Sequence, residues 1–182
     1  TQEDYEALAK RLKNLNMPVL PMVGNHDDRH LFRENFVLPT AAMDKFIQFT
    51  LSAPDGLFVC LDTQKTGSDA GELCADRLAW LQNVLENADD TPVFIFMHHP
   101  PMTLGLPMQD TDRMIDGDVF LDLVSGYPCV KYLFIGHVHR PISGTIRGVP
   151  FPTMRSILYQ APAPKPAWNW HTFKPSEEAP NL

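Results

Sequence analysis

The sequence predicts an α/β fold. Three times along the chain an amphipathic helical pattern precedes a short apolar stretch, at 3–15 then 17–23, 75–88 then 92–97, and 118–125 then 130–135. The stretches VFIFM and VKYLFI are almost entirely apolar, which is typical of strands that are covered on both faces. Helices and strands that alternate in this way predict a sheet with helices packed against it.

The helix predicted over 3–15 has an apolar stripe along one face. The stripe consists of Tyr5, Leu8, Leu12 and Leu15. Acidic residues occupy the first turn and basic residues the last, as the helix dipole favours. The strand predicted over 17–23 follows this helix and ends at the turn that begins with Gly24.

Two β-hairpins and two further helices complete the predicted elements. Residues 46–63 contain two strand-like stretches around the turn sequence APDG, and a second hairpin is predicted around Gly148. A leucine stripe predicts the helix over 75–88, and the helix over 118–125 is expected to stop near Gly126. The proline-rich sequence APAPKPAW is expected to form a surface loop.

Length and charge limit the class of protein. At 182 residues the chain is the size of one domain, so we interpret residues 1–182 as a single domain. The formal net charge of -7 argues against a nucleic acid polymer or a membrane as partner, because both favour a basic surface. Three well-separated cysteines in apolar surroundings favour free thiols in a reducing compartment, and hence a cytoplasmic location.

Histidines gather at the ends of the predicted strands. Five of the seven lie in the motifs GNHDD, MHHPP and GHVH, namely His26, His98, His99, His137 and His139. In open α/β sheets, ligands bind beyond the carboxyl ends of the strands, so these three loops are expected to converge. Imidazole nitrogens and the carboxamide oxygen of Asn25 suit zinc, manganese, iron or cobalt, whereas the absence of thiolates argues against a structural zinc site.

The ordered set GNHDD, MHHPP and GHVH resembles the calcineurin-like metallophosphoesterases, most closely the branch of cyclic nucleotide and glycerophosphodiester phosphodiesterases. The resemblance implies an αββα sandwich of the metallophosphoesterase type. It also implies hydrolysis of a phosphodiester at a dinuclear metal centre that supplies a metal-bound hydroxide. By this resemblance Asn25, His98 and His137 would hold one metal ion and His139 would belong to the other. His26 would contact the phosphate or protonate the leaving group.

Two motifs of the family are not in place. The family has an Asp-x-His and a Gly-Asp upstream of GNH. In this chain the same residue types occur in DRH at 28–30 and in Gly117-Asp118, but both lie after GNH instead of before it. We therefore expect a sandwich that is incomplete at the N-terminus, in a fragment that is truncated before residue 1 and after residue 182. At most one of the two divalent ions is expected in this fragment. An open sheet edge would favour a homo-oligomer.

Several roles stay open in the sequence. His99 would face the substrate or satisfy backbone groups, and Arg140 would contact phosphate or pair with a surface acid. Asp62 would orient a group near the site or cap a turn, and Asp27 would fix the tautomer of His26. The favoured substrate is a cyclic nucleotide similar to cAMP or a glycerophosphodiester, chosen by the loops 28–45 and 102–117. The alternatives are an inactive truncated or degenerate metal-binding scaffold, and a phosphomonoesterase or phosphoprotein phosphatase.

Overall fold

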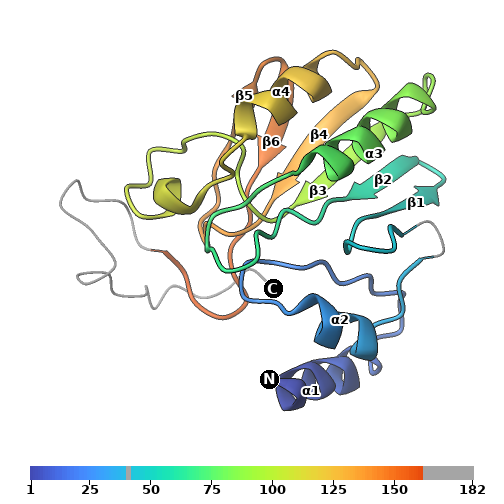
Figure 1. Cartoon of the computed structure of the whole chain (residues 1–182), viewed down its shortest axis with the longest axis vertical. Helices are drawn as coiled ribbons and strands as arrows, with labels where there is room; N and C mark the ends of the chain where they lie inside the picture. Colours follow the sequence, from blue (N-terminus) through green and yellow to red (C-terminus); the bar gives the residue numbers. More distant parts are fainter. Residues whose placement is uncertain (40–41, 162–182) are drawn as a thin grey trace.

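A four-stranded sheet forms the centre of the molecule, in a computed structural model that describes residues 1–39 and 42–161. The strand order is β1 (Phe49–Ala53), β2 (Gly56–Cys60), β3 (Val93–Met97) and β4 (Val130–Ile135) (Figure 1). The first two strands form the predicted antiparallel hairpin, and β2, β3 and β4 are parallel. The α/β fold class is confirmed. The predicted proline-rich loop lies almost wholly outside the described residues.

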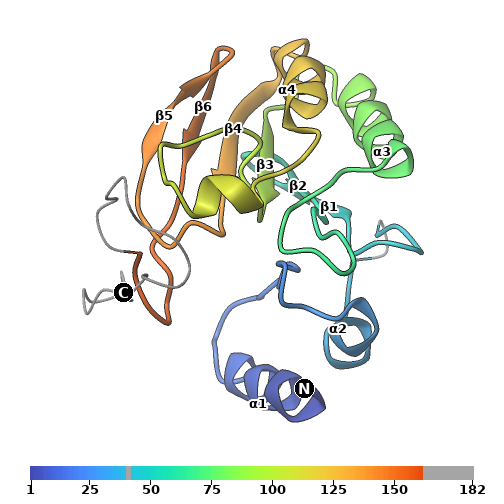
Figure 2. The ribbon, with the colours of Figure 1, turned by 60° about the vertical axis from the view of Figure 1, so that its left-hand side comes forward.

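Helices α3 (Ala75–Glu86) and α4 (Gly117–Ser125) cover one face of the sheet (Figure 2). Both agree with the predicted helices, and their apolar side chains pack on the inward-facing residues of the strands. The fully buried members of this core include Val59, Leu81, Val93, Ile95, Phe120, Val124 and Leu133. Among the described residues, no helix is long and apolar enough to cross a membrane.

The opposite face of the sheet carries a ladder of aromatic rings. Stacked pairs join Phe96 to Phe134 and Phe94 to Tyr132, with ring centroids 4.7 and 6.4 Å apart. These side chains are only partly covered, and 43% of Tyr132 is exposed. The expectation that β3 and β4 are covered on both faces is therefore wrong for the described residues. Apolar composition alone does not distinguish a doubly covered strand from one with an aromatic outer face.

The second predicted hairpin is also present. Strands β5 (Ser143–Ile146) and β6 (Val149–Pro152) pair in antiparallel fashion around Arg147 and Gly148, which both have positive φ. A bridge between Ile135 and Thr153 joins the end of β6 to the end of β4. The hairpin thereby returns the chain to the carboxyl end of the sheet, where the histidine motifs lie.

The N-terminal segment differs from the prediction. Helix α1 (Gln2–Leu12) forms as expected, but residues 17–23 are irregular instead of forming a strand. Pro18 and Pro21 have no N–H group, so neither can donate to a strand ladder. Sequence analysis did not identify α2 (Arg29–Asn35), a short helix whose first N–H groups bond to the carboxylate of Asp28.

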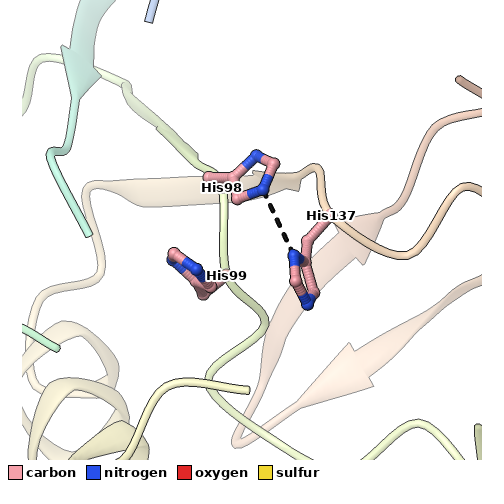
Figure 3. A group of neighbouring side chains, drawn as sticks. All are labelled: His98, His99 and His137. Carbon is pink, nitrogen blue, oxygen red and sulfur yellow. Dashed lines mark hydrogen bonds between the residues drawn. The ribbon is translucent and has the colours of Figure 1, made fainter. Parts of the chain in front are cut away.

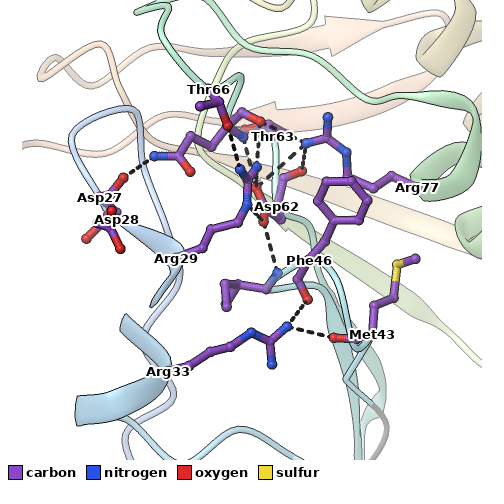
Figure 4. A network of polar contacts seen from close by, with 12 residues as sticks. Asp27, Asp28, Arg29, Arg33, Met43, Phe46, Asp62, Thr63, Thr66 and Arg77 are labelled. Carbon is purple, nitrogen blue, oxygen red and sulfur yellow. Dashed lines mark hydrogen bonds and ion pairs between the residues drawn. The ribbon is translucent and has the colours of Figure 1, made fainter. Parts of the chain in front are cut away.

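A buried carboxylate connects α2 to the sheet. The side chain of Asp62, at the end of β2, is completely buried and accepts two hydrogen bonds from Arg29, at 2.6 and 2.8 Å. It also accepts the backbone N–H groups of Ile47 and Gln64, and the guanidinium of Arg77 lies 3.7 Å away (Figure 4). Asp62 therefore both caps a turn and joins separate parts of the chain.

Removing this charge is expected to destabilise the fold. Asp62→Asn would remove the counter-ion of the partly buried Arg29 and would leave Glu72, 3.6 Å away, as the remaining acidic partner of the buried Arg77. It would also place an amide N–H2 against Arg29. Breaking one side of a buried ion pair typically costs about 3 to 5 kcal/mol in the free energy of unfolding. Urea denaturation of this variant, with the exposed Asp90→Asn as control, measures the loss. A change below about 1 kcal/mol would contradict the role assigned to Asp62.

Candidate metal centre

Three turns at the carboxyl end of the sheet bring the GNHDD, MHHPP and GHVH motifs together. His98 follows β3 directly, Gly136 and His137 follow β4, and Gly24 leads into Asn25 from the irregular segment before it. Close packing favours glycine at two of these turns. A Cβ atom at Gly24 would clash with the His98 ring at 2.8 Å, and one at Gly136 would be a tight contact at 3.2 Å. The expected convergence of the three loops is what the structure shows.

Asn25, His98 and His137 point their side-chain donor atoms at one another. His98 Nε2 lies 2.9 Å from Asn25 Oδ1. It also lies 3.2 Å from His137 Nδ1 (Figure 3). Two ligands about 2.0 to 2.1 Å from one ion, at tetrahedral or octahedral angles, are about 2.8 to 3.4 Å apart. Both separations measured from His98 Nε2 therefore fit pairs of ligand atoms on a single divalent ion.

Two buried ring nitrogens have no hydrogen-bond partner within the described part of the chain. They are Nε2 of His137 and Nδ1 of His139. Both residues adopt the left-handed backbone conformation, with φ of 66° and 52°, which is uncommon outside glycine and often marks a functional site. Buried polar atoms without partners are rare in folded proteins, and an ion or ordered water commonly satisfies them. Nδ1 of His139 can therefore accept an ion, whereas Nε2 of His137 would carry the ring proton when Nδ1 is the ligand atom.

Burial keeps these histidines neutral. It lowers the pKa of His98 well below its usual value, and the neighbouring imidazoles add to the effect. Burial likewise lowers the pKa of His137 to about 3. The pKa of the half-buried His139 is also lowered, again mainly by burial. A neutral imidazole offers a lone pair, so all three rings are in the form that binds a metal at neutral pH.

His99 lies within the same cluster, since ligand atoms of His98, His99 and His137 are all within 4.8 Å of one another. However, His99 is completely buried and both of its ring nitrogens are engaged. Nε2 is 3.1 Å from the carbonyl oxygen of Asp69, and Nδ1 is 2.8 Å from the hydroxyl of Thr63. The ring has no free lone pair and does not reach the cavity, so the structure favours the backbone-satisfying alternative over substrate contact.

A cavity of about 380 Å³ opens beside these histidines. It is lined by Asn25, His26, Asp69, His98, Gln109, Asp112, His137, His139, Tyr159 and Ala161. His26 is exposed at this cavity, with Nε2 3.5 Å from Asn25 Nδ2. Sequence analysis assigned no role to Asp69, Gln109, Asp112 or Tyr159. Gln109 and Asp112 lie in the short 3-10 helix η1 (Gln109–Asp112), within the segment 102–117 expected to choose the substrate. Tyr159 lies in an irregular segment, and none of the three belongs to a recognisable motif.

Two predicted contacts are replaced by others. Arg140 donates from Nη1 to the carbonyl of Ala161 at 3.0 Å, rather than to a surface acid, and it is not among the residues that line the cavity. Asp27 accepts the hydroxyl of Tyr5 and the N–H of Gly24, at 2.8 and 2.7 Å, so it holds the turn instead of His26. In both cases a nearby backbone group competes for the side chain.

The misplaced motifs lie away from the cavity. His30 of DRH is 81% exposed at its side chain and pairs with Glu34, while Asp28 caps α2. Asp118 pairs with Arg147 on the surface near β5 and β6. Neither motif supplies a ligand to the histidine cluster in the described structure.

Comparison with known proteins agrees with the geometry. Residues 1–141 match the sequence profile of a family described as calcineurin-like phosphoesterase. The chain belongs to this family. The family is that of the sequence resemblance, so membership in the calcineurin-like phosphoesterases is confirmed.

Named relatives include two kinds of phosphodiesterase. A protein named as a probable cyclic nucleotide phosphodiesterase, from Rhodopseudomonas palustris, is 37% identical over 159 residues, covering 86% of this chain and 58% of the relative. A glycerophosphodiester phosphodiesterase from Enterobacter lignolyticus is 29% identical over 163 residues, covering 88% of this chain and 59% of the relative. The calcineurin-like phosphoesterase chain thus spans somewhat less than two thirds of the length of these relatives.

A solved structure shares the fold. The dimetal phosphatase from Danio rerio aligns with a TM-score of 0.54 and 18% identity, over 65% of this chain and 52% of the other. At this identity the similarity concerns the arrangement of strands and helices. It confirms that the calcineurin-like phosphoesterase chain has the metallophosphoesterase type of fold.

The lowered pKa values predict that the metal-free chain loses stability in acid. The histidine pKa is 6.5 before folding, whereas in the folded chain the pKa of His99 is about 4 and that of His137 about 3. At a pH between 6.5 and the folded-state pKa, each histidine binds more protons in the unfolded state than in the folded state. The free energy of unfolding therefore falls as the pH drops below 6.5. Each histidine contributes up to about 1.4 kcal/mol per pH unit.

Urea denaturation at neutral and mildly acidic pH, with a chelator present, measures this slope. His137→Asn is expected to reduce the slope, whereas the exposed His30→Ala leaves it unchanged. Equal stability of the parent chain at both pH values would contradict the assignment of neutral buried histidines.

Proposed function

We propose that this chain is part of a metal-dependent hydrolase of small phosphodiesters. The observation that carries the proposal is the convergence of Asn25 Oδ1, His98 Nε2 and His137 Nδ1, with separations of 2.9 and 3.2 Å about His98. These three residues would hold one divalent ion, and His139 would serve a second. Zinc, manganese, iron or cobalt at these positions would polarise the phosphoryl oxygens and lower the pKa of the attacking water.

His26 would act on the substrate and not on the ion. Its ring is exposed at the cavity beside Asn25, whereas the three proposed ligands are each partly buried. From this position an imidazole can donate a hydrogen bond to a phosphoryl oxygen or a proton to the departing alkoxide. Asn25 joins the two functions, because its carboxamide contacts both His26 and His98.

Cyclic nucleotides and glycerophosphodiesters are the proposed substrates. The relatives from Rhodopseudomonas palustris and Enterobacter lignolyticus are named for these two classes. A cavity of about 380 Å³ lies within the usual range for small-molecule sites. The net charge of -7 argues against a nucleic acid polymer.

The free thiols of Cys60, Cys74 and Cys129 support a cytoplasmic location, and an exposed sheet face supports a homo-oligomer.

A metal-binding scaffold without activity is the second candidate. His139 is the one residue that we assign to the second ion, and it lines the cavity in the described part of the chain. The residue types of the family's upstream motifs recur at Asp28, His30 and Asp118. These side chains make contacts elsewhere on the described surface. Metal binding without hydrolysis, in this chain and in a longer one that includes both upstream motifs, would favour this candidate.

Metal analysis tests the proposed ligands. The purified chain is expected to bind at most one tightly held cobalt or zinc ion, because one ligand set is nearly complete and the other is not. Asn25→Ala, His98→Ala and His137→Ala should each weaken binding by at least about tenfold, whereas His30→Ala should not. Calorimetric titration gives the affinity and elemental analysis the stoichiometry. Two tightly bound ions per chain, or unaltered affinity in all three variants, would contradict the assignment.

The role of His26 is best tested in an active, N-terminally extended protein. If His26 protonates the leaving group, His26→Ala should reduce kcat/KM for an alkyl phosphodiester about 10²- to 10⁴-fold more than for a nitrophenyl phosphodiester. The nitrophenolate leaves without protonation, and metal content should stay normal in the variant. An equal loss on both substrates would indicate phosphate positioning instead, and loss of metal would make His26 a ligand.

A further inference from the structure

The hydrogen bonds of His99 determine which of its nitrogens carries the proton. The carbonyl oxygen of Asp69 only accepts, so Nε2, which lies 3.1 Å away, must be the N–H donor. Nδ1 must then accept, and the hydroxyl of Thr63 donates to it across 2.8 Å. The backbone N–H of His99 donates in turn to the same hydroxyl, at 3.2 Å. All hydrogen-bonding groups of the buried ring are satisfied in one arrangement.

This arrangement holds the loop 69–71 against the end of β3. The carbonyl of Asp69 is bound to the His99 ring, and Gly71 packs so closely on that ring that a Cβ atom there would lie 2.5 Å away. The N–H of Gly71 also donates to the carbonyl of Arg113 at 3.3 Å. The backbone that carries the Asp69 side chain is therefore fixed from two sides.

The fixed loop places a carboxylate beside the side-chain amide of Asn25. Nδ2 of Asn25 donates to Oδ1 of Asp69 at 3.3 Å, while Oδ1 of Asn25 lies 2.9 Å from His98 Nε2. A carboxylate accepts hydrogen bonds and cannot donate them, so it stabilises the amide with its N–H2 group toward Asp69. The reversed amide would place two oxygen acceptors together and would turn N–H2, which cannot bind a cation, toward His98.

We propose that His99 and Asp69 form a positioning relay that directs the carboxamide oxygen of Asn25 toward the metal site. His99 fixes the Asp69 loop, Asp69 selects the amide orientation, and Asn25 presents its oxygen beside His98 and His137. The proposal rests on the proposed function for the presence of a metal ion. The orientation of Asn25 is a property of the chain itself, so it can be measured without the ion.

Nuclear magnetic resonance of the metal-free chain tests the orientation. Nitrogen shifts of His99 are expected to show protonated Nε2 and unprotonated Nδ1. One side-chain amide proton of Asn25 should show the downfield shift and slowed exchange of a hydrogen bond, and both features should be lost in Asp69→Ala. Asp69→Asn keeps an acceptor oxygen and should retain them, as should the exposed Asp90→Asn, which lies outside this loop. A His99 ring protonated at Nδ1, or an Asn25 amide unaffected by Asp69→Ala, would overturn the relay.

Cobalt binding tests the consequence for the metal site. Asp69→Ala is expected to weaken the affinity for Co²⁺ about 10- to 100-fold and to change its visible absorption spectrum, while Asp69→Asn stays near the parent. In the Asn25→Ala background, Asp69→Ala should have no further effect, since its action passes through Asn25. If Asp69→Ala lowers the Co²⁺ affinity by the same factor in the parent chain and in Asn25→Ala, the relay is overturned. Failure of the parent chain to bind Co²⁺ would instead refute the proposed function, and the magnetic resonance result would still decide the orientation.

Discussion

The structure depends on the buried ion pair between Asp62 and Arg29. A carboxylate with no exposed surface is costly unless its charge and lone pairs are matched, and here two N–H groups of Arg29 and two backbone N–H groups match them. The pair joins β2 of the central sheet to α2, which begins three residues after His26. The pair thereby fixes the GNHDD turn relative to the strand ends that carry His98 and His137, on the two sides of the proposed metal site.

This connection matters because the two sides belong to different hydrophobic clusters. His98 and His137 extend from strands of the large core beneath α3 and α4, whereas the GNHDD turn lies beside a small cluster of Val23, Phe32 and Ile47. Gln64 adds a further link by donating from its side chain to the carbonyl of Asp27. A small cluster supplies little packing energy, so these polar links determine how closely Asn25 approaches His98.

Sequence patterns predicted the elements with a strong local signature, including α1, and missed α2, whose start depends on the cap formed by Asp28. The leucine stripe of α3 and the turn sequences of both hairpins report local preferences, so these elements were found. Residues 17–23 read as a strand because apolar composition does not reveal whether a partner strand pairs with them, and Pro18 and Pro21 already argued against it. In the site, motif spacing identified Asn25, His98 and His137, but Asp69 has no motif of its own. Its role arises only when the loop folds against His99.

Charge sets the final constraint on the site. The residues that line the described cavity include no lysine or arginine, and two of them, Asp69 and Asp112, are acids. Burial keeps His98 and His137 neutral, because it lowers their pKa values. The same effect that frees their lone pairs for a cation therefore removes the positive charge that would attract a phosphodiester. Among the described lining residues, no lysine or arginine offsets Asp69 and Asp112. Metal ions at the proposed site would therefore supply positive charge for binding an anionic phosphodiester as well as for the chemical step.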